Sequence, residues 1–195
     1  MKKRRKNSKE VNLLFEAQLL RRIKRTGWQI LGENEESVAA HSYLTAIITF
    51  VLAKELKLNS EKALIMALFH DFHETRTGDV DKISLNYITR DIDKANREIF
   101  SVLPFGQEIL AILKEYEEKK SLIARIVYEA NILALMVELK GLVDRGNRYA
   151  REWLSANGER VKLKQAKKLA RQIMTTDSQD FWKDIRDNLH DKFRK

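Results

Sequence analysis

The chain has 195 residues, with 37 Lys and Arg against 28 Asp and Glu, a formal net charge of +9 and no cysteine. The absence of cysteine excludes a disulfide framework, a thiolate metal site and a cysteine nucleophile, so a metal would need His, carboxylate or amide ligands. One proline and seven glycines leave few turns, and the abundance of Leu, Ala, Lys, Glu and Arg is typical of an all-α protein.

The length predicts a single domain. Residues 1–10 are expected to form a basic disordered tail and residues 11–195 a helical domain. No apolar stretch approaches the roughly 18 residues that span a bilayer, so we expect a cytoplasmic protein without membrane contact. The positive charge suits an anionic ligand. Nucleic acid is not an expected partner, because no recognition motif accompanies the charge.

The first predicted helix runs from residue 11 to about residue 27. Its last turn carries Arg22 and Arg25, and Trp28 follows. Cations at a helix C-terminus stabilise the helix by themselves, which is one explanation of this cluster. The other is that a guanidinium beside an indole holds a phosphate and stacks on a base.

Apolar residues at helical spacing predict that most of the remaining chain is α-helical. His41 lies near the start of a second helix, and Asn131 in the middle of a long apolar one. Residues 80–91 mix polar and isolated apolar residues, so we expect an irregular loop that acts as a lid. The further helices are predicted at residues 38–57, from residue 60 onward, and at 93–103, 107–119, 121–144, 159–174 and 178–193.

The stretch from His70 to Asp79, HDFHETRTGD, gathers two imidazoles and three carboxylates. On one helix, Glu74 would share a face with His70 and Asp71. Gly78 permits a positive φ, which would let the chain leave the helix and return Asp79 toward the same place. This composition and spacing predict a functional site.

The apolar run at residues 63–69 leads into this stretch, so His70 and Asp71 should arrive from a buried helix. A buried imidazole beside a buried carboxylate needs partners, and a divalent metal satisfies both. Taken alone, a His-Asp pair is more often a structural hydrogen-bonded pair. The presence of His41 on another helix with a similar apolar lead favours the metal. His190 has no such context and is predicted to lie on the surface.

A histidine on one helix, an adjacent His-Asp on the next and a polar oxygen ligand on a later helix resemble the HD-domain metal-dependent phosphohydrolases. The spacing His-Asp-x-x-Glu-x-x-x-Gly-Asp is similar to that of the 5'-deoxynucleotidase branch, which hydrolyses deoxynucleoside monophosphates and forms homodimers. Residues 36–43 (ESVAAHSY) resemble its first-histidine motif, 25–28 (RTGW) its substrate-binding Arg and Trp, and 127–147 its last-ligand helix. The resemblance covers residues 13–147, and the later helices form a C-terminal extension.

The resemblance implies a single all-α HD-domain helical bundle holding one divalent metal, which could be Mn, Co, Zn, Ni, Fe or Mg. The implied protein ligands are His41, His70, Asp71 and Asn131. His73 is expected beside the metal site rather than as a ligand. Two positions depart from the family: Ala40 replaces an acidic residue, and Asn131 replaces an aspartate ligand, so the site has one negative charge fewer.

The resemblance also implies roles in catalysis. Glu74 would position the attacking water or exchange its proton, and Asp79 would orient the substrate or assist proton transfer. Arg25 would hold the phosphate, with Arg22 as the alternative, and Trp28 would pack on the sugar or base.

We therefore expect a homodimeric enzyme that removes the 5'-phosphate from (deoxy)nucleoside monophosphates. The alternative is a nucleotide-binding or scaffold protein that keeps the fold and is catalytically impaired, and its main support is Asn131.

Overall fold

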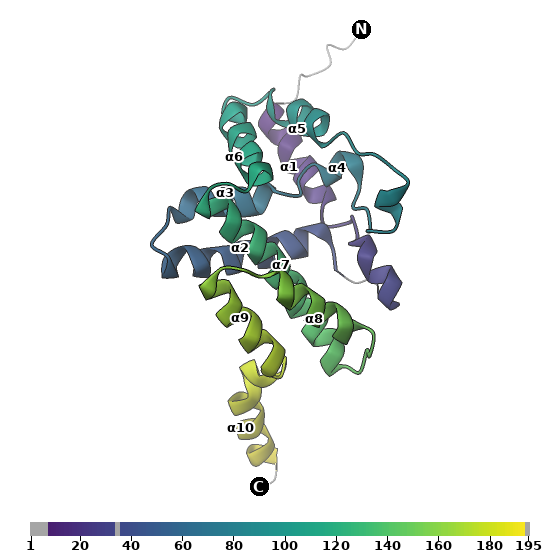
Figure 1. Ribbon diagram of the computed structural model, residues 1–195, viewed down its shortest axis with the longest axis vertical. Coiled ribbons are helices and arrows are strands. Elements are labelled where there is room, and N and C mark those ends of the chain that lie inside the picture. Colours follow the sequence, from purple (N-terminus) through teal and green to yellow (C-terminus); the bar gives the residue numbers. More distant parts are fainter. Residues whose placement is uncertain (1–7, 34–35, 194–195) are drawn as a thin grey trace.

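The computed structural model describes residues 8–33 and 36–193, which form α-helices and short 3-10 helices (Figure 1). Across these residues it contains no β-strand, and the expected all-α fold is confirmed. The elements in chain order are α1 (Lys9–Leu19), the 3-10 helix η1 (Thr26–Leu31), α2 (Val38–Glu55), α3 (Ser60–Phe69), α4 (Glu74–Thr77), η2 (Ser84–Asn86), α5 (Ile92–Phe100), α6 (Gly106–Glu118), α7 (Leu122–Asp144), α8 (Ala150–Arg160), α9 (Lys164–Thr175), η3 (Asp180–Trp182) and α10 (Lys183–Phe193).

Helix α7 is the central element and contacts α2, α3, α6, α8 and α9. Its start is capped by Ser121, whose Oγ accepts from the N–H of Ala124 at 3.0 Å. Apolar residues on nearly every face suit it to burial. Leu133 and Leu139 are completely buried, and burial of one such side chain is worth about 1.5–3 kcal/mol. The predicted long apolar helix is therefore confirmed.

A second group of buried side chains surrounds the turn that follows α3. The ring of Phe72 in this turn packs against those of Phe69 and Phe100, with centroids 5.5 Å away in both cases. Such aromatic pairs are each worth about 0.5–1.5 kcal/mol beyond the area they bury. Because Phe69 and Phe72 flank His70 and Asp71, these contacts hold the His-Asp dipeptide in place.

The first helix ends earlier than its apolar pattern predicts, at Leu19 instead of near residue 27. The backbone of residues 20–25 pairs instead with the segment 36–39 that leads into α2. For example, the N–H of Val38 donates to the carbonyl of Ile23 at 2.9 Å. Hydrogen bonds between distant segments thus replace the local helical ones in this turn.

The predicted basic tail falls mostly on residues 1–7, which lie outside the described residues. Its last three residues take part in α1. The hydroxyl of Ser8 accepts from the N–H of Val11 at 3.1 Å, and the helix begins at Lys9.

The predicted helix over residues 159–174 is wrong in its extent, because the structure has α8 followed by α9 with a break at Val161–Leu163. Glu129 of α7 stabilises this break, because its carboxylate accepts hydrogen bonds from the N–H groups of Lys162 and Leu163 at 3.1 and 3.0 Å.

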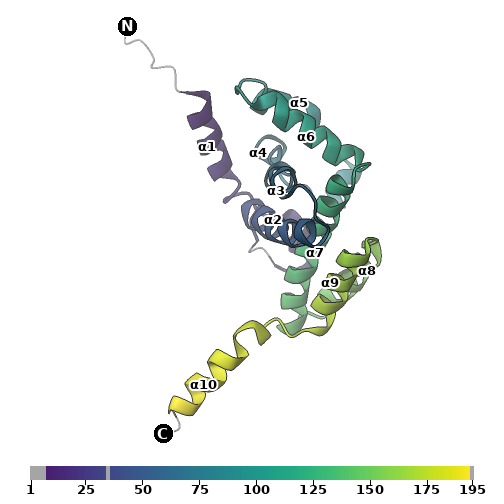
Figure 2. The same cartoon turned by 90° about the vertical axis from the view of Figure 1, so that its left-hand side faces the viewer.

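Beyond α9, Figure 2 shows α10 standing away from the helices that pack on α7. No helix within the described ranges is long and apolar enough to cross a membrane.

Candidate active site

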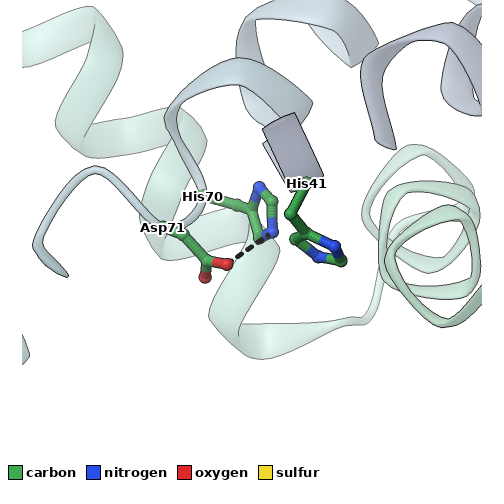
Figure 3. A group of neighbouring side chains, drawn as sticks. All are labelled: His41, His70 and Asp71. Carbon is green, nitrogen blue, oxygen red and sulfur yellow. Dashed lines mark ion pairs between the residues drawn. The ribbon is translucent and has the colours of Figure 1, made fainter. Parts of the chain in front are cut away.

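Two histidines and one aspartate come together where α2 meets the end of α3 (Figure 3). His41 lies near the start of α2, His70 is the C-cap residue of α3, and Asp71 follows it. One possible ligand atom from each of the three lies within 4.8 Å of the others. Both imidazoles are fully buried, and the Asp71 side chain is 15% exposed.

The hydrogen bonding of His70 leaves its Nε2 facing another acceptor. Its Nδ1 lies 2.8 Å from the carbonyl of Ala67. Because a carbonyl can only accept, Nδ1 carries a proton. In the neutral imidazole, Nε2 then presents its lone pair to Oδ2 of Asp71, 3.1 Å away. Two buried acceptors at this distance require a proton or a metal cation between them.

Asn131, from α7, faces His41 on the other side of the site. Its Oδ1 lies 2.9 Å from Nε2 of His41, and its Nδ2 donates to the hydroxyl of Tyr116 at 3.2 Å. The Tyr116 ring also packs edge-on against His70, with centroids 5.5 Å apart. Tyr116 therefore joins the two sides of the site.

The contacts His70–Asp71 and His41–Asn131 have the spacing of neighbouring metal ligands. Bonds of about 2.1 Å to one ion place adjacent ligand atoms about 3.0–3.4 Å apart in octahedral or tetrahedral geometry, and the contacts measure 3.1 and 2.9 Å. Two imidazoles, a carboxylate and an amide oxygen suit Zn, Mn, Fe, Co or Ni. The residues present therefore fit one divalent metal.

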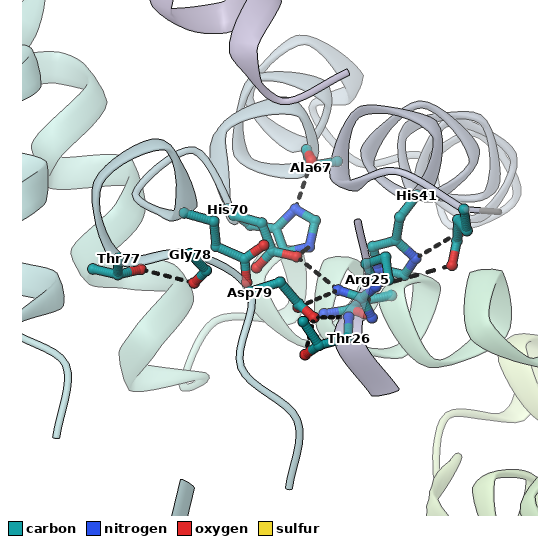
Figure 4. Close-up of polar contacts among 12 residues, drawn as sticks. Arg25, Thr26, His41, Ala67, His70, Thr77, Gly78 and Asp79 are labelled. Atoms are coloured by element: carbon teal, nitrogen blue, oxygen red, sulfur yellow. Dashed lines mark hydrogen bonds and ion pairs between the residues drawn. The ribbon is translucent and has the colours of Figure 1, made fainter. Parts of the chain in front are cut away.

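Arg25 lies among the carboxylates of the site (Figure 4). Its Nη1 is 3.4 Å from Oδ2 of Asp71 and 3.6 Å from Oδ1 of Asp79, and its Nε is 3.9 Å from Oε2 of Glu36. Burial alone would raise the pKa of Asp71, but the adjacent His70 and Arg25 hold it well below its usual range. The guanidinium therefore already faces anionic oxygens.

Asp79 ties the loop after α4 to the turn that carries Arg25. Its Oδ2 accepts from the backbone N–H and the hydroxyl of Thr26 at 2.5 and 2.8 Å. Gly78 just before it has a φ of 70°, as the sequence predicted. Glycine adopts this conformation without steric cost, and this lets the chain turn back to the site.

Glu74 is also buried, with its side chain 6% exposed. Its Oε1 lies 3.7 Å from Nη1 of Arg90, which also donates to the carbonyl of Gly78 at 3.4 Å. Burial raises the pKa of Glu74 to about 10, and the negative charges of Asp71 and Asp79 act in the same direction. Without a metal, this carboxyl group therefore holds a proton at neutral pH.

The expectation that His70, Asp71 and Glu74 share one helix face is wrong. Helix α3 ends at Phe69, and a tight turn follows in which Phe72 and Glu74 donate to carbonyls three residues earlier, at 3.1 and 3.0 Å. Such three-residue hydrogen bonds wind the chain more tightly than an α-helix. Helix α4 then begins at Glu74, which still lies close enough to Asp71 for their charges to interact.

The other residues named from the sequence differ in how close they lie to the site. Trp28 lies in η1, but its indole is 4% exposed and donates to Glu36 at 2.6 Å, so its contact with a sugar or base stays a prediction. Arg22 is exposed and has no ion pair with these carboxylates within the described residues. His73 is buried beside the site, and burial lowers its pKa. His190 is exposed on α10.

Glu36, Arg90 and Tyr116 were not predicted as site residues. Glu36 stands in the same segment as His41, but its spacing from that histidine does not reveal that it also reaches Trp28. Arg90 ends an irregular loop, and Tyr116 lies on a helix with no polar motif. Their contacts depend on how separate helices pack.

Comparison with known proteins identifies related chains. A family model described as an HD domain matches residues 17–185. The 5'-deoxynucleotidase HDDC2 of Mus musculus is 29% identical over 138 residues, which are 68% of this chain and 69% of that protein. The Homo sapiens protein of the same name is 30% identical over 125 residues, and the match spans 61% of each chain. The solved structure of the PH0347 protein from Pyrococcus horikoshii OT3 aligns with a TM-score of 0.70 at 30% identity, covering 86% of this chain and 98% of that one.

Proposed function

Since this chain belongs to the HD domain family, we propose that it is a metal-dependent phosphohydrolase that removes the 5'-phosphate from (deoxy)nucleoside monophosphates. The observation that carries the proposal is the cluster of His41, His70 and Asp71, with two contacts at the spacing of metal ligands, His70 to Asp71 at 3.1 Å and His41 to Asn131 at 2.9 Å. The names of the relatives, 5'-deoxynucleotidases, support the same reaction and substrate class.

The metal ligands of the proposal are His41, His70, Asp71 and Asn131. A divalent metal bound there supplies a Lewis acid that polarises the phosphoryl oxygens and activates water. The proton on Nδ1 of His70, held by the carbonyl of Ala67, keeps the Nε2 lone pair directed into the site.

Arg25 binds the phosphate in the proposed reaction. Its guanidinium already lies 3.4–3.6 Å from carboxylate oxygens of Asp71 and Asp79, so an anionic phosphoryl group can take up the same kind of contact. Asp79 holds the backbone of Thr26 and thereby orients the turn that presents Arg25. Its proposed role is therefore to orient the bound substrate.

Glu74 is the residue that exchanges a proton. In hydrolysis, the oxygen of water forms a bond to phosphorus while the bond from phosphorus to the 5'-oxygen breaks. One proton of the water must leave, and the departing 5'-oxygen must gain one. A buried carboxyl group that is held by Arg90 can position the water and move this proton.

We further propose that the protein acts as a homodimer. Four large apolar side chains are exposed on one face of α2, at successive spacings of four, three and one residues: Tyr43, Ile47, Phe50 and Val51. Contiguous exposed apolar groups commonly mark an interaction surface. Light scattering coupled to size exclusion tests this, and a monomer at micromolar concentration would contradict it.

One observation favours a second function. Asn131 contributes no negative charge, so the metal would be held more weakly than by a carboxylate. A protein with such a site could bind nucleotides without turning them over.

A phosphate-release screen separates the two functions. The full chain is incubated with nucleoside and deoxynucleoside 5'-monophosphates and with Mn²⁺, Co²⁺, Zn²⁺, Ni²⁺, Fe²⁺ or Mg²⁺ in turn, and His70→Ala serves as the inactive control. We expect release of phosphate from at least one 5'-monophosphate that is lost in the control. Metal and nucleotide binding without release would instead support the binding protein, and absence of metal binding would contradict both.

A further inference from the structure

Glu36 is a buried carboxylate that lies between the two halves of the candidate site. It comes directly before Ser37, the N-cap residue of α2, and its side chain is only 7% exposed. Its backbone carbonyl accepts from the N–H of Arg25 at 3.0 Å. Neither the metal ligands nor the substrate-binding residues named above include it.

The two oxygens of Glu36 face different partners. Oε2 accepts from the indole Nε1 of Trp28 at 2.6 Å and lies 3.9 Å from Nε of Arg25. Oε1 lies 3.4 Å from Nδ1 of His41. Neither Oε1 nor this Nδ1 has a hydrogen-bond partner in the described part of the chain, so their 3.4 Å approach has the distance of an ion pair without the geometry of a hydrogen bond. Because both atoms are buried, a proton on Nδ1 would give each of them a partner.

This arrangement favours one protonation state of His41 when a metal is bound. A carboxylate oxygen can only accept, so Oε1 favours a proton on Nδ1. Nε2 lies 2.9 Å from Oδ1 of Asn131, which also can only accept, so without a metal Nε2 would donate a proton to it. A metal in place of that proton would bind the Nε2 lone pair while Nδ1 keeps its proton toward Glu36. The carbonyl of Ala67 acts on His70 in the same way. A charged carboxylate in this position also makes the ligating nitrogen more basic.

On its other side, Glu36 fixes the turn proposed to bind the substrate. The indole N–H of Trp28 is a buried donor and needs an acceptor, which Oε2 supplies. The same oxygen and the Glu36 carbonyl both lie beside Arg25. One side chain therefore holds a metal ligand and the phosphate-binding turn at once.

We propose that Glu36 is a positioning residue that orients His41 for metal binding through Oε1 and the turn of Arg25 and Trp28 through Oε2. This inference rests on the proposed function, since it assigns Glu36 a task in the same metal-dependent site. It predicts that metal binding and substrate binding depend on the same carboxylate.

The substitution Glu36→Gln tests the proposal because an amide cannot replace both contacts. The carboxylate offers an acceptor to each of two donors, Nδ1–H of His41 and Nε1–H of Trp28, whereas glutamine has one acceptor and one donor. If its amide nitrogen faces His41, the proton moves to Nε2 and the ligand lone pair is lost. If it faces Trp28, the indole loses its acceptor.

Metal binding and the environment of Trp28 report the two orientations of the introduced amide. Calorimetric titration of Mn²⁺ into the full chain is expected to show 10–100-fold weaker binding by Glu36→Gln, the usual effect of removing a carboxylate that orients a metal-binding histidine. Nitrogen chemical shifts of the wild type loaded with diamagnetic Zn²⁺ are expected to show the His41 proton on Nδ1, a measurement that does not depend on the folding of any variant. In the alternative orientation of the amide, the fluorescence of Trp28 changes and KM rises.

Glu129→Gln is the matched control, because Glu129 is an equally buried carboxylate that binds backbone N–H groups near α9. It should leave Mn²⁺ affinity within about twofold, since its contacts lie outside the site. Trp28→Phe removes only the Oε2 partner and should likewise retain the metal.

The outcomes separate this inference from the proposed function. A Zn²⁺-loaded protein in which Nδ1 of His41 carries no proton, or a Glu36→Gln protein with wild-type Mn²⁺ affinity and unchanged Trp28 fluorescence and KM, would overturn the role of Glu36. In that case, loss of metal binding in the His41→Ala variant would show that the metal site exists without a role for Glu36, and the proposed function would stand. A wild-type protein that binds no divalent metal would overturn both.

Discussion

The substitution Asn131→Asp adds one negative charge to the site at nearly constant volume. Oδ1 of Asn131 lies 2.9 Å from Nε2 of His41, so the new carboxylate would face the position between the proposed ligands. The other amide atom now donates to Tyr116, whose hydroxyl can instead donate to a carboxylate oxygen. The change is therefore sterically mild, and its effect should be electrostatic.

The expected effect on metal affinity is a gain. Two unit charges about 4 Å apart interact by about 4 kcal/mol at an effective dielectric constant of about 20, and a divalent ion doubles this to about 8 kcal/mol. Removing water from the carboxylate and the ion as they meet costs several kcal/mol. The remaining 1.4–3 kcal/mol or so corresponds to roughly ten- to hundredfold tighter binding. Phosphate release should equal or exceed that of the wild type.

Without metal, the same variant should be less stable. The new charge joins the carboxylates of Asp71 and Asp79 in a site with little exposure. A like charge at about 4 Å costs about 4 kcal/mol at the same dielectric constant. Thermal unfolding is therefore expected at lower temperature without metal, with the loss reversed when Mn²⁺ is added.

The assay is a calorimetric titration of Mn²⁺ into wild type and variant, paired with thermal unfolding of each with and without the ion. Asn157→Asp is the control, because Asn157 is a buried asparagine on α8 whose side chain contacts Trp153 and Arg160 rather than the site. If Asn131→Asp lowers stability but leaves Mn²⁺ affinity unchanged, Asn131 is a hydrogen-bonded core residue. That result would refute its placement beside the metal.

Three further predictions concern the other site residues. His70→Ala and Asp71→Ala should each abolish metal retention, measured by elemental analysis after desalting, while circular dichroism still reports a helical protein; wild-type metal content in both would remove the proposed ligands. Glu74→Gln should keep the metal and lose at least about a hundredfold in kcat, because it removes a proton-exchanging group; a kcat within a few-fold of wild type would exclude this role. Arg25→Ala should chiefly raise KM, whereas the exposed Arg22→Ala should not, and the reverse result would move phosphate binding to Arg22.

Much of the fold followed from local patterns. The apolar repeat predicted α2, the start of α3 and the long α7 to within a few residues, because a helix that buries one or more faces must place apolar side chains at helical spacing. Residues 80–91 are irregular apart from η2, as their polar composition predicted. The left-handed backbone of Gly78 was predicted from its residue type alone.

The residue types of the site were also visible in the sequence, since only a few positions combine His and carboxylates after an apolar helix. The backbone structure that was expected to bring them together was wrong. A continuous helix through Glu74 was expected, but packing of Phe72 against Phe69 and Phe100 stabilises a turn after Phe69. Local periodicity does not contain this contact, because Phe100 belongs to a helix about thirty residues later.

The sequence by itself determined the helical class, the order of most helices and which side chains could hold a metal, because these depend on residue type and short-range spacing. Only the tertiary structure decided the end of the first helix, where residues 20–25 pair with residues 36–39, and the partners of each histidine. It alone brought Glu36 against both His41 and Trp28, and Arg90 against Glu74. These contacts join segments that are separate in the chain, and their geometry is fixed by how helices pack rather than by the residues that neighbour them in sequence.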